Sequence, residues 1–292
     1  VGEVEPRREF LQEIWALPFV DMPHDTRLVE HEGTAAAYAH AVWDPSEGGH
    51  QFGLGRVIPG HRGRGIGTAL LAWMEGGAIL RGRRDEAPII PRTSIVSLDG
   101  SAAALLRGRG YRLVRSGVDM GMALRGDELA IPPPEGIRFD QFITGRDEHT
   151  AFTLHRETFA DHWGRFPTTM EAFAQEWWEA PTWDAELVVV ARRDAEPIGF
   201  VASIIVSGGG YITSLGVREP WRGRGVATAL MRRTIADLAA RGCRDVFLSA
   251  DEGNATGATA LYTSLGMTIR RRTLVYDGPA ERGPGTLSVT TP

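Results

Sequence analysis

Two short segments of this 292-residue chain combine positive charge with backbone freedom, as a binding site for an anion requires. They are VIPGHRGRGIGTALL at residues 57–71 and VREPWRGRGVATALM at residues 217–231. Each runs through a proline-containing turn and Arg-Gly-Arg-Gly into small and apolar residues at helical spacing. The first N–H groups of a helix lack internal partners and lie at the positive end of the helix dipole. Both segments therefore predict an anion site, with a pyrophosphate as the natural ligand.

The glycines and arginines of these segments have separate roles in this prediction. Glycines let the backbone approach a ligand closely, and arginines add charge without a competing acceptor. The residues are Arg62, Gly63, Arg64 and Gly65 in the first segment and Arg222, Gly223, Arg224 and Gly225 in the second. The alternative for either segment alone is a surface turn with solvated arginines. A Rossmann loop is not indicated, because neither segment contains G-x-G-x-x-G.

The repetition predicts an internal duplication and therefore two similar domains. A hairpin, a strand into the loop, a helix, a strand, a short helix and a last strand follow one another in the second half and, less clearly, in the first. We expect an N-terminal domain at 1–126, a linker at 127–136, a C-terminal domain at 137–276 and a flexible tail at 277–292. The proline triplet at 132–134 marks the linker, because it continues neither a helix nor a sheet ladder.

The composition, 42% hydrophobic and 24% charged, describes a soluble globular protein and excludes several function classes. No apolar run approaches the roughly 20 residues of a membrane span, so we expect no membrane partner. The net charge of −5 argues against nucleic acid as a partner. The chain contains no lysine, which excludes a Walker A phosphate loop and Schiff-base chemistry through a lysine.

The single cysteine, Cys243, excludes an internal disulfide and fits a cytoplasmic protein. It begins an apolar run typical of a strand. A small packed residue is therefore favoured over a nucleophile, and no metal site is predicted.

The segments RGRGIG (62–67) and RGRGVA (222–227) also fit the signature R/Q-x-x-G-x-G/A of the GCN5-related N-acetyltransferases, the GNAT family. The second half carries a further block typical of this family, NATGATALYTSLGM at 254–267. With two such domains, the chain resembles the tandem members of the family, the mycothiol synthases and their relatives. The resemblance implies an α/β fold of two tandem domains, each with a mixed, mostly antiparallel sheet flanked by helices on both faces.

The resemblance further implies acetyl-CoA as the cofactor. In the C-terminal domain, the backbone of Leu215 and Val217 is expected to pair with the pantetheine arm, next to the pyrophosphate loop. The loop residues expected to hold the cofactor are Arg222, Gly223, Arg224, Gly225, Val226, Ala227 and Thr228, and in the N-terminal domain Val57, Arg62, Gly63, Arg64, Gly65, Ile66, Gly67 and Thr68.

Tyr262 is implied as the general acid of an acetyl transfer, and the chemistry supports this role. When an amine attacks a thioester, the leaving thiolate must gain a proton, which a neutral phenol can supply. The alternative is that Tyr262 packs into the core. Asn254 is implied to contact the cofactor arm or to support the start of the helix.

The general base is left open. Many GNAT proteins place a glutamate on the fourth strand of the domain, but GYITSLGV (210–217) offers none. The candidates, acting directly or through water, are Glu157, Asp161, His162 and Glu252. His162 titrates in a useful range, although the sequence DHWG also fits a loop packed on its tryptophan.

The first half departs from the family pattern. Leu106 lies opposite Tyr262 when Gly110 is aligned with Gly266, and no asparagine matches Asn254. Leucine cannot donate a proton. The N-terminal domain is therefore expected to keep the cofactor loop and to have lost the acid, or to use another residue.

The acceptor is predicted to be a small molecule with a primary amine. The segment 159–183 is rich in aromatic residues and carboxylates, which suit a cationic amine, and equally suit a helix packed on the core. An amino-sugar antibiotic, a thiol-sugar precursor and a peptide N-terminus stay open, as does the oligomeric state. The sequence thus predicts an acetyl-CoA-dependent N-acetyltransferase. The alternative is a non-catalytic acyl-CoA-binding or regulatory module.

Overall fold

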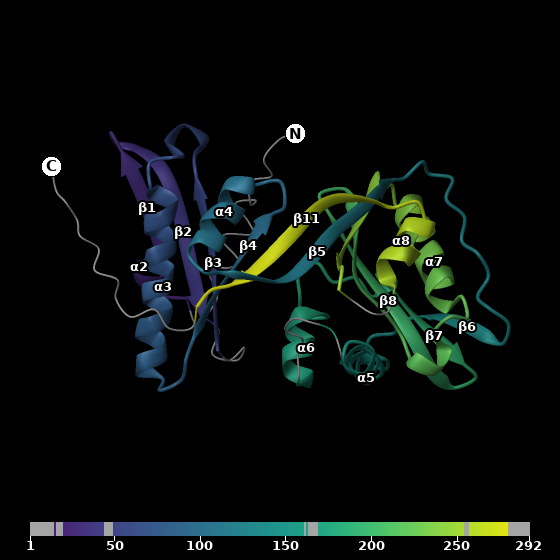
Figure 1. Cartoon of the computed structure of the whole chain (residues 1–292). Coiled ribbons are helices and arrows are strands. Elements are labelled where there is room, and N and C mark those ends of the chain that lie inside the picture. The colour runs from purple at the N-terminus through teal and green to yellow at the C-terminus, as the bar shows by residue number, and fades with distance from the viewer. Residues whose placement is uncertain are drawn as a thin grey trace. The chain divides into compact units, whose positions relative to one another are not determined.

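The protein, seen here in a computed structural model, is described over residues 15, 20–43, 49–160, 162, 169–253 and 257–279 (Figure 1). It divides into two compact units. Unit 1 comprises residues 1–116 together with 273–292, and unit 2 comprises residues 117–272.

Unit 1 is built on a mixed sheet with one parallel pair, β3 and β4. Its strands, in spatial order, are β1 (Thr26–His31), β2 (Thr34–Trp43), β3 (His50–Val57), β4 (Ile90–Val96) and the last five residues of β11 (Thr268–Asp277). Its helices are α2 (Met22–Asp25), the 3-10 turn η2 (Pro59–His61), α3 (Ile66–Arg84) and α4 (Gly100–Gly108). Helices α3 and α4 pack on β2 and β11 through Leu71, Met74 and Leu106.

Unit 2 repeats this architecture with one more strand, one more α-helix and one more 3-10 turn among its described residues. Its strands, in spatial order, are the second part of β5 (Arg112–Ala123), β10 (Asp245–Asp251), β9 (Gly209–Val217), β8 (Glu196–Val206), β7 (Val188–Arg193) and β6 (Ile137–Gln141). Only β9 and β10 run parallel. Its helices are α5 (Glu148–Thr158), α6 (Met170–Glu176), α7 (Val226–Ala240) and α8 (Ala258–Ser264), with the 3-10 turns η3 (Ala185–Leu187) and η4 (Glu219–Trp221).

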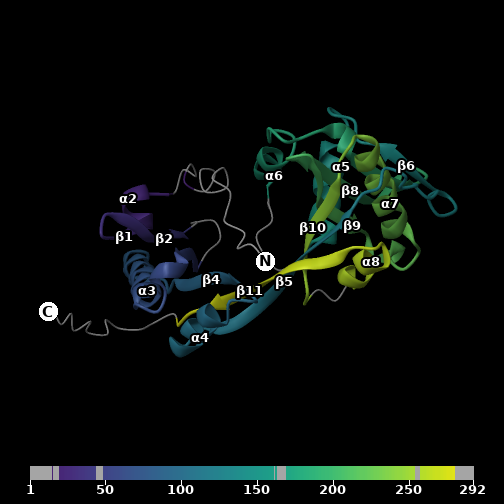
Figure 2. The ribbon, with the colours of Figure 1, turned by 90° about the horizontal axis from the view of Figure 1, so that it is seen from above.

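The sheet of unit 2 separates two hydrophobic cores. Helices α7 and α8 cover one face, where Leu230 and Leu238 of α7 are fully buried against Val246 and Leu248. Helices α5 and α6 cover part of the other face, around Phe200. Figure 2 shows the two helix pairs on opposite sides of this sheet. Burial on both faces explains why β7 and β8 are almost continuously apolar.

The end strands of the two sequence halves are exchanged between the units. Residues 117–123 of β5 pair antiparallel with β10, and residues 273–277 of β11 pair antiparallel with β4. The bounds of the compact units therefore differ from the expected domain bounds, 1–126 and 137–276. Those domain bounds describe the duplicated halves of the sequence and stay a prediction. The predicted tandem, mixed-sheet α/β fold is confirmed by the two units.

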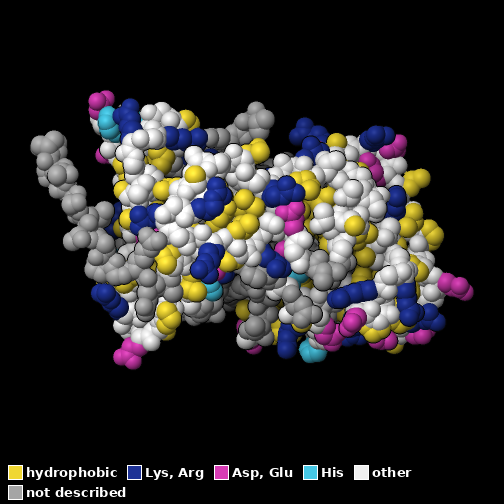
Figure 3. Space-filling view, in the orientation of Figure 1, with side chains coloured by type: hydrophobic (Ala, Val, Ile, Leu, Met, Phe, Trp, Pro, Cys, Tyr) yellow, Lys and Arg dark blue, Asp and Glu magenta, His cyan; other side chains and the backbone are white. Residues whose placement is uncertain are grey.

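The other expectations about organisation have mixed outcomes. Residues 127–136 contain no helix or strand and lie inside unit 2, so their role as a linker stays a prediction. Of the expected tail only 277–279 is described. None of the described helices is long and apolar enough to cross a bilayer. Figure 3 shows acidic and basic side chains interspersed over the described part of the visible face.

Candidate functional site

The loop between β9 and α7 has the backbone of an anion site. Gly223 and Gly225 adopt φ angles of 72° and 80°, in the left-handed region that favours glycine. Gly225 caps α7 without any side-chain hydrogen bond, and the first bond of the helix runs from Ala229 N to Gly225 O. The three N–H groups before Ala229 thus have no acceptor within the helix. They belong to Val226, Ala227 and Thr228, all of which are expected to hold the pyrophosphate.

Arg222 stabilises this loop rather than only adding charge. Its Nε donates to the carbonyl of Val217, 3.0 Å away, at the end of β9. The loop is thereby tied to the strand that precedes it. Arg224 lies over the ring of Trp221, 5.2 Å from the ring centroid. This cation–π contact keeps its charge at the loop.

The loop of unit 1 has the same geometry. Nε of Arg62 donates to the carbonyl of Val57 at 3.2 Å. Gly63 and Gly65 have φ angles of 75° and 80°, and Gly65 caps α3. The two segments singled out in the sequence therefore fold alike.

The parallel strands beside each loop part before they end. Strand β9 pairs with β10 only over 210–212, although β9 continues to Val217. In unit 1, β3 pairs with β4 only as far as Gly53, although β3 continues to Val57. Among the strands that the structure describes, none therefore pairs with the β10-facing edge of β9 over 213–217. An extended chain with amide groups, such as a pantetheine arm, could pair with this edge, which includes the predicted residue Leu215.

Tyr262 lies on α8 with its ring in the core of α7 and α8, and only 8% of its surface is exposed. Burial raises the pKa of its hydroxyl to about 12, so the phenol stays protonated at neutral pH. Among the described residues, none forms a hydrogen bond with this hydroxyl. The two interpretations of Tyr262 are compatible, because the ring packs in the core while the hydroxyl keeps its proton.

The predicted Asn254 lies outside the described residues, as does Asp161. The backbone N–H of His162 donates to the carbonyl of Phe159 at 2.9 Å, and the two rings lie 5.2 Å apart. His162 therefore lies at the edge of the aromatic core of α5 and α6.

The two glutamates proposed as bases are both paired with arginines. Arg218 donates to both carboxylate oxygens of Glu157, at 2.6 and 3.3 Å. Arg272 donates to both oxygens of Glu252, at 2.7 to 3.0 Å. Because a permanently charged arginine holds both oxygens of each glutamate, neither carboxylate has an oxygen left to accept a proton from an amine.

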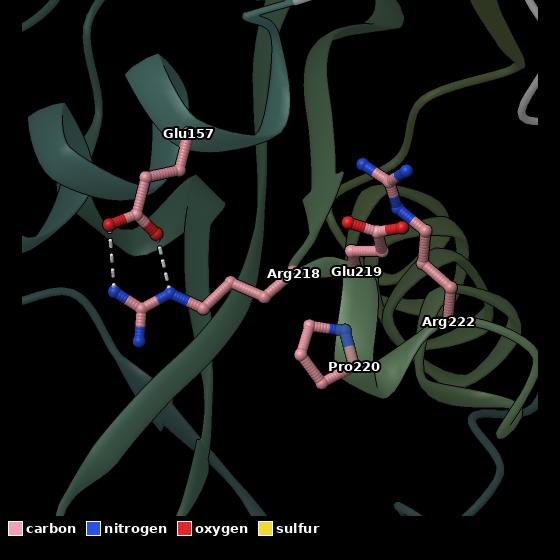
Figure 4. Close-up of a pocket in the computed structure, with 5 residues that line it drawn as sticks. All are labelled: Glu157, Arg218, Glu219, Pro220 and Arg222. Atoms are coloured by element: carbon pink, nitrogen blue, oxygen red, sulfur yellow. Dashed lines mark hydrogen bonds and ion pairs between the residues drawn. The ribbon is translucent and has the colours of Figure 1, made fainter.

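The Glu157–Arg218 pair borders an open hollow of about 330 Å³ next to the loop (Figure 4). Its remaining lining residues are Glu219, Pro220 and Arg222, and Figure 4 shows Glu219 and Pro220 between the two arginines. The hollow adds polar groups of both signs beside the anion site.

The aromatic residues that the structure describes within 159–183 lie in the core of α5 and α6 or pack against it. Trp177 is 8% exposed and packs against Phe173, at a centroid distance of 4.4 Å, while Trp183 packs at its edge. Sequence reasoning did not single out His155, which lies in the same cluster. Burial, followed by the charge of His162, lowers the pKa of His155 to about 4.

Two further interpretations can be compared with the structure. Cys243 is buried, and burial raises the pKa of its thiol, which confirms a packed residue. Leu106 is 4% exposed within the core of unit 1. Sequence reasoning missed Asp119 and Ser249, whose side chains are hydrogen-bonded to each other, with Ser249 also bonded to Tyr211. Asp119 and Ser249 lie 130 positions apart, a separation that no sequence spacing reveals.

Comparisons with known proteins place the chain among acetyltransferases. A family model described as Acetyltransferase (GNAT) family matches residues 149–267. A mycothiol acetyltransferase of Thermobispora bispora is 32% identical over 222 residues, which cover 73% of this chain and 70% of that protein. The crystal structure of a GCN5-related N-acetyltransferase from Sphaerobacter thermophilus is 31% identical, with a TM-score of 0.81, and the match covers 94% of this chain and 86% of that one.

A tandem GNAT protein from the clavulanic acid biosynthesis pathway is similar in fold. Its TM-score is 0.67 at 16% identity, and the match covers 94% of this chain and 89% of that one.

Proposed function

The chain belongs to the GNAT family of acetyltransferases and is an N-acetyltransferase, and we propose that unit 2 transfers an acetyl group from acetyl-CoA to the primary amine of a small molecule, with Tyr262 as general acid. The observation that carries the proposal is the presence, within this one unit, of the anion loop, the unpaired edge of β9 and a buried tyrosine with no described hydrogen-bond partner. Unit 1 shares the first two features, but its helix α4 carries Leu106 at the position that the sequence aligns with Tyr262.

The residues of unit 2 fit acetyl-CoA, which when bound supplies the acetyl thioester. The N–H groups from Gly223 to Thr228 would hold the pyrophosphate, because they lie at the positive end of α7. A Cβ atom at Gly223 would have no protein atom within 4 Å, which leaves the loop open to a ligand. The unpaired backbone of β9 at Leu215 and Val217 would bind the pantetheine amides.

Tyr262 would then protonate the sulfur as the C–S bond breaks. A phenol with a pKa near 12 is a weak acid. However, the same desolvation that raises the pKa of Tyr262 also raises the proton affinity of a thiolate formed beside it. Proton transfer from the phenol to the thiolate is therefore less unfavourable than the pKa values of the two groups in water suggest.

For the acceptor, we propose an amine related to mycothiol. The support is the relative named mycothiol acetyltransferase, which this chain matches over most of its length. A thiol-sugar precursor with a free amine is thus the first acceptor to test, followed by amino sugars and peptide N-termini.

We propose that unit 1 binds a ligand or serves as a scaffold and does not catalyse acetyl transfer. Leu106 supports this role, because a leucine buried in the core of unit 1 can pack but cannot donate a proton.

The test is acetyl transfer by the Tyr262→Phe variant, followed as free thiol released from acetyl-CoA. We expect kcat to fall by about 10²- to 10⁴-fold, the usual contribution of a general acid, with the Kd of acetyl-CoA nearly unchanged. Tyr276→Phe, which removes a hydroxyl in unit 1, is the matched control and should keep full activity. Full activity of Tyr262→Phe would show that another group protonates the sulfur.

A further inference from the structure

Three side chains on one face of the unit 2 sheet form a continuous hydrogen-bonded chain. Oη of Tyr211 on β9 lies 3.1 Å from Oγ of Ser249 on β10, and this Oγ lies 2.7 Å from Oδ1 of Asp119 on β5. The other oxygen of Asp119 accepts a hydrogen bond from Nε of Arg271 at 2.6 Å. The chain thus crosses three neighbouring strands and ends on an ion pair.

Chemistry fixes the direction of this chain. The carboxylate of Asp119 can only accept, so Ser249 donates its single proton to Asp119. Ser249 therefore has none left for Tyr211, and Tyr211 must donate to Ser249. The lone pairs of the Tyr211 oxygen are left to accept a hydrogen bond from a third group. An amine or ammonium N–H is such a donor, and the negative charge of Asp119 strengthens the acceptor through the chain.

The location of the chain matches that of an attacking amine. Strands β9 and β10 pair at three positions, of which Tyr211–Phe247 is the second and Ile212–Leu248 the last. Ser249 is the next residue along β10 after this last pair. The Tyr211–Ser249 bond therefore spans the point where the strands part. An acetyl group lying between the separating strands would be next to it.

The chain also lies on an open face. Residues 212 and 248 point into the core of α7 and α8, so the alternating residues 211 and 249 point the other way. The described core of α5 and α6 includes residues of β7 and β8 and none of β10 or β5. Ser249 is accordingly exposed, and Phe247 beside it is 38% exposed. An acceptor can thus reach the chain from solvent.

We propose that Tyr211 binds the acceptor amine and removes its proton, with Ser249 and Asp119 as positioning residues of a proton relay. This inference rests on the acetyl transfer proposed above. As the amine nitrogen bonds to the carbonyl carbon, its proton passes to Tyr211, the Tyr211 proton to Ser249, and the Ser249 proton to Asp119. The C–S bond breaks, and Tyr262 protonates the sulfur. Asp119 then loses a proton to solvent and Tyr262 regains one, so that amine and thioester have become amide and thiol.

The relay explains how unit 2 can act without a glutamate on β9. It also assigns a catalytic contribution to the first half of the sequence, because Asp119 belongs to β5.

The test compares Tyr211→Phe, Ser249→Ala and the double variant, with amines that the wild-type protein acetylates in the thiol-release assay. The panel consists of a cysteinyl amino sugar, glucosamine and an alanyl peptide. Each single variant should lower kcat/KM for the amine by about 10²-fold and leave the Kd of acetyl-CoA within about twofold. The double variant should be no worse than the worse single one, because both break the same relay.

Two further variants separate a relay from a structural role. Ser249→Thr keeps the hydroxyl and should recover most of the activity lost in Ser249→Ala. Ser101→Ala is the matched control, because Ser101 donates to Asp99 at 2.6 Å in unit 1, and it should behave as wild type.

Contrary outcomes are distinguishable. Activity within twofold of wild type in Ser249→Ala, or additive effects in the double variant, would overturn the relay and leave the proposed function standing. A wild-type protein that acetylates no amine of the panel would overturn both.

Discussion

Replacing Gly225 with valine tests which loop binds acetyl-CoA. Gly225 has φ = 80° and ψ = 0° at the start of α7. A Cβ atom there would lie 3.8 Å from Cγ of Pro134, an ordinary van der Waals contact. The substitution therefore strains the backbone without causing a clash inside the protein.

The structure allows both consequences to be estimated. A left-handed conformation costs an L-residue about 1–2 kcal/mol, and a β-branched side chain is at the upper end. This lowers the melting temperature by roughly 2–4 °C for each kcal/mol lost. If valine relaxes out of this conformation, at least one N–H group turns away from the pyrophosphate. A hydrogen bond to a charged group contributes about 1.5–3 kcal/mol, so the Kd of acetyl-CoA should rise by roughly 10- to 100-fold.

Gly65→Val is the matched control, because Gly65 has φ = 80° and ψ = −6°, and a Cβ atom at this position would have no protein atom within 4 Å. Both variants should lose similar stability in thermal unfolding. Only Gly225→Val should weaken the tight binding of acetyl-CoA in titration calorimetry. Equal affinity in the Gly225 variant and wild type would show that this loop does not hold the pyrophosphate, and a loss in the Gly65 variant alone would move the site to unit 1.

Three other predictions concern stability. The unfolded chain protonates His155 near pH 6.5, whereas the folded protein keeps it neutral down to about pH 4. The free energy of unfolding should therefore fall by about 3 kcal/mol as the pH drops through this window. Chemical denaturation should show a smaller fall for His155→Phe than for the wild-type protein. Leu106→Ala should cost about 2–5 kcal/mol by the same measurement and leave kcat unchanged, since it opens a cavity in unit 1. A fragment of residues 137–279 should be less soluble and melt less cooperatively than one of residues 117–279, because it lacks the strand that pairs with β10.

The sequence predicted the backbone of the two Gly-Arg loops because their physics is local, while anion binding by them stays a prediction. Glycines that alternate with arginines before a helical pattern require left-handed φ angles, and the four glycines of the two loops all have them. The apolar runs likewise predicted β7 and β8, since burial on both faces leaves a direct mark on composition.

Strand partners could not be predicted in the same way, because pairing depends on contacts between distant residues. Gly121 illustrates this. It lies opposite Phe247 in the β5–β10 ladder, and a Cβ atom at position 121 would come within 2.6 Å of the Phe247 ring. The missing side chain thus admits the ring, but nothing in the sequence links residues 126 positions apart (247 − 121). The relay of Asp119 and Ser249 was missed for the same reason.

The exchange of end strands changes how the loss of the acid in the first half should be understood. If each half of the sequence formed a complete unit, a copy with Leu106 in place of a tyrosine would be dispensable for catalysis. Instead, the unit that contains Tyr262 takes residues 117–123 from the first half, and β10 would otherwise have an unpaired edge. The fold of unit 2 therefore needs β5 whatever unit 1 binds. If Asp119 ends the proton relay, the first half is needed for the chemistry as well as for the fold.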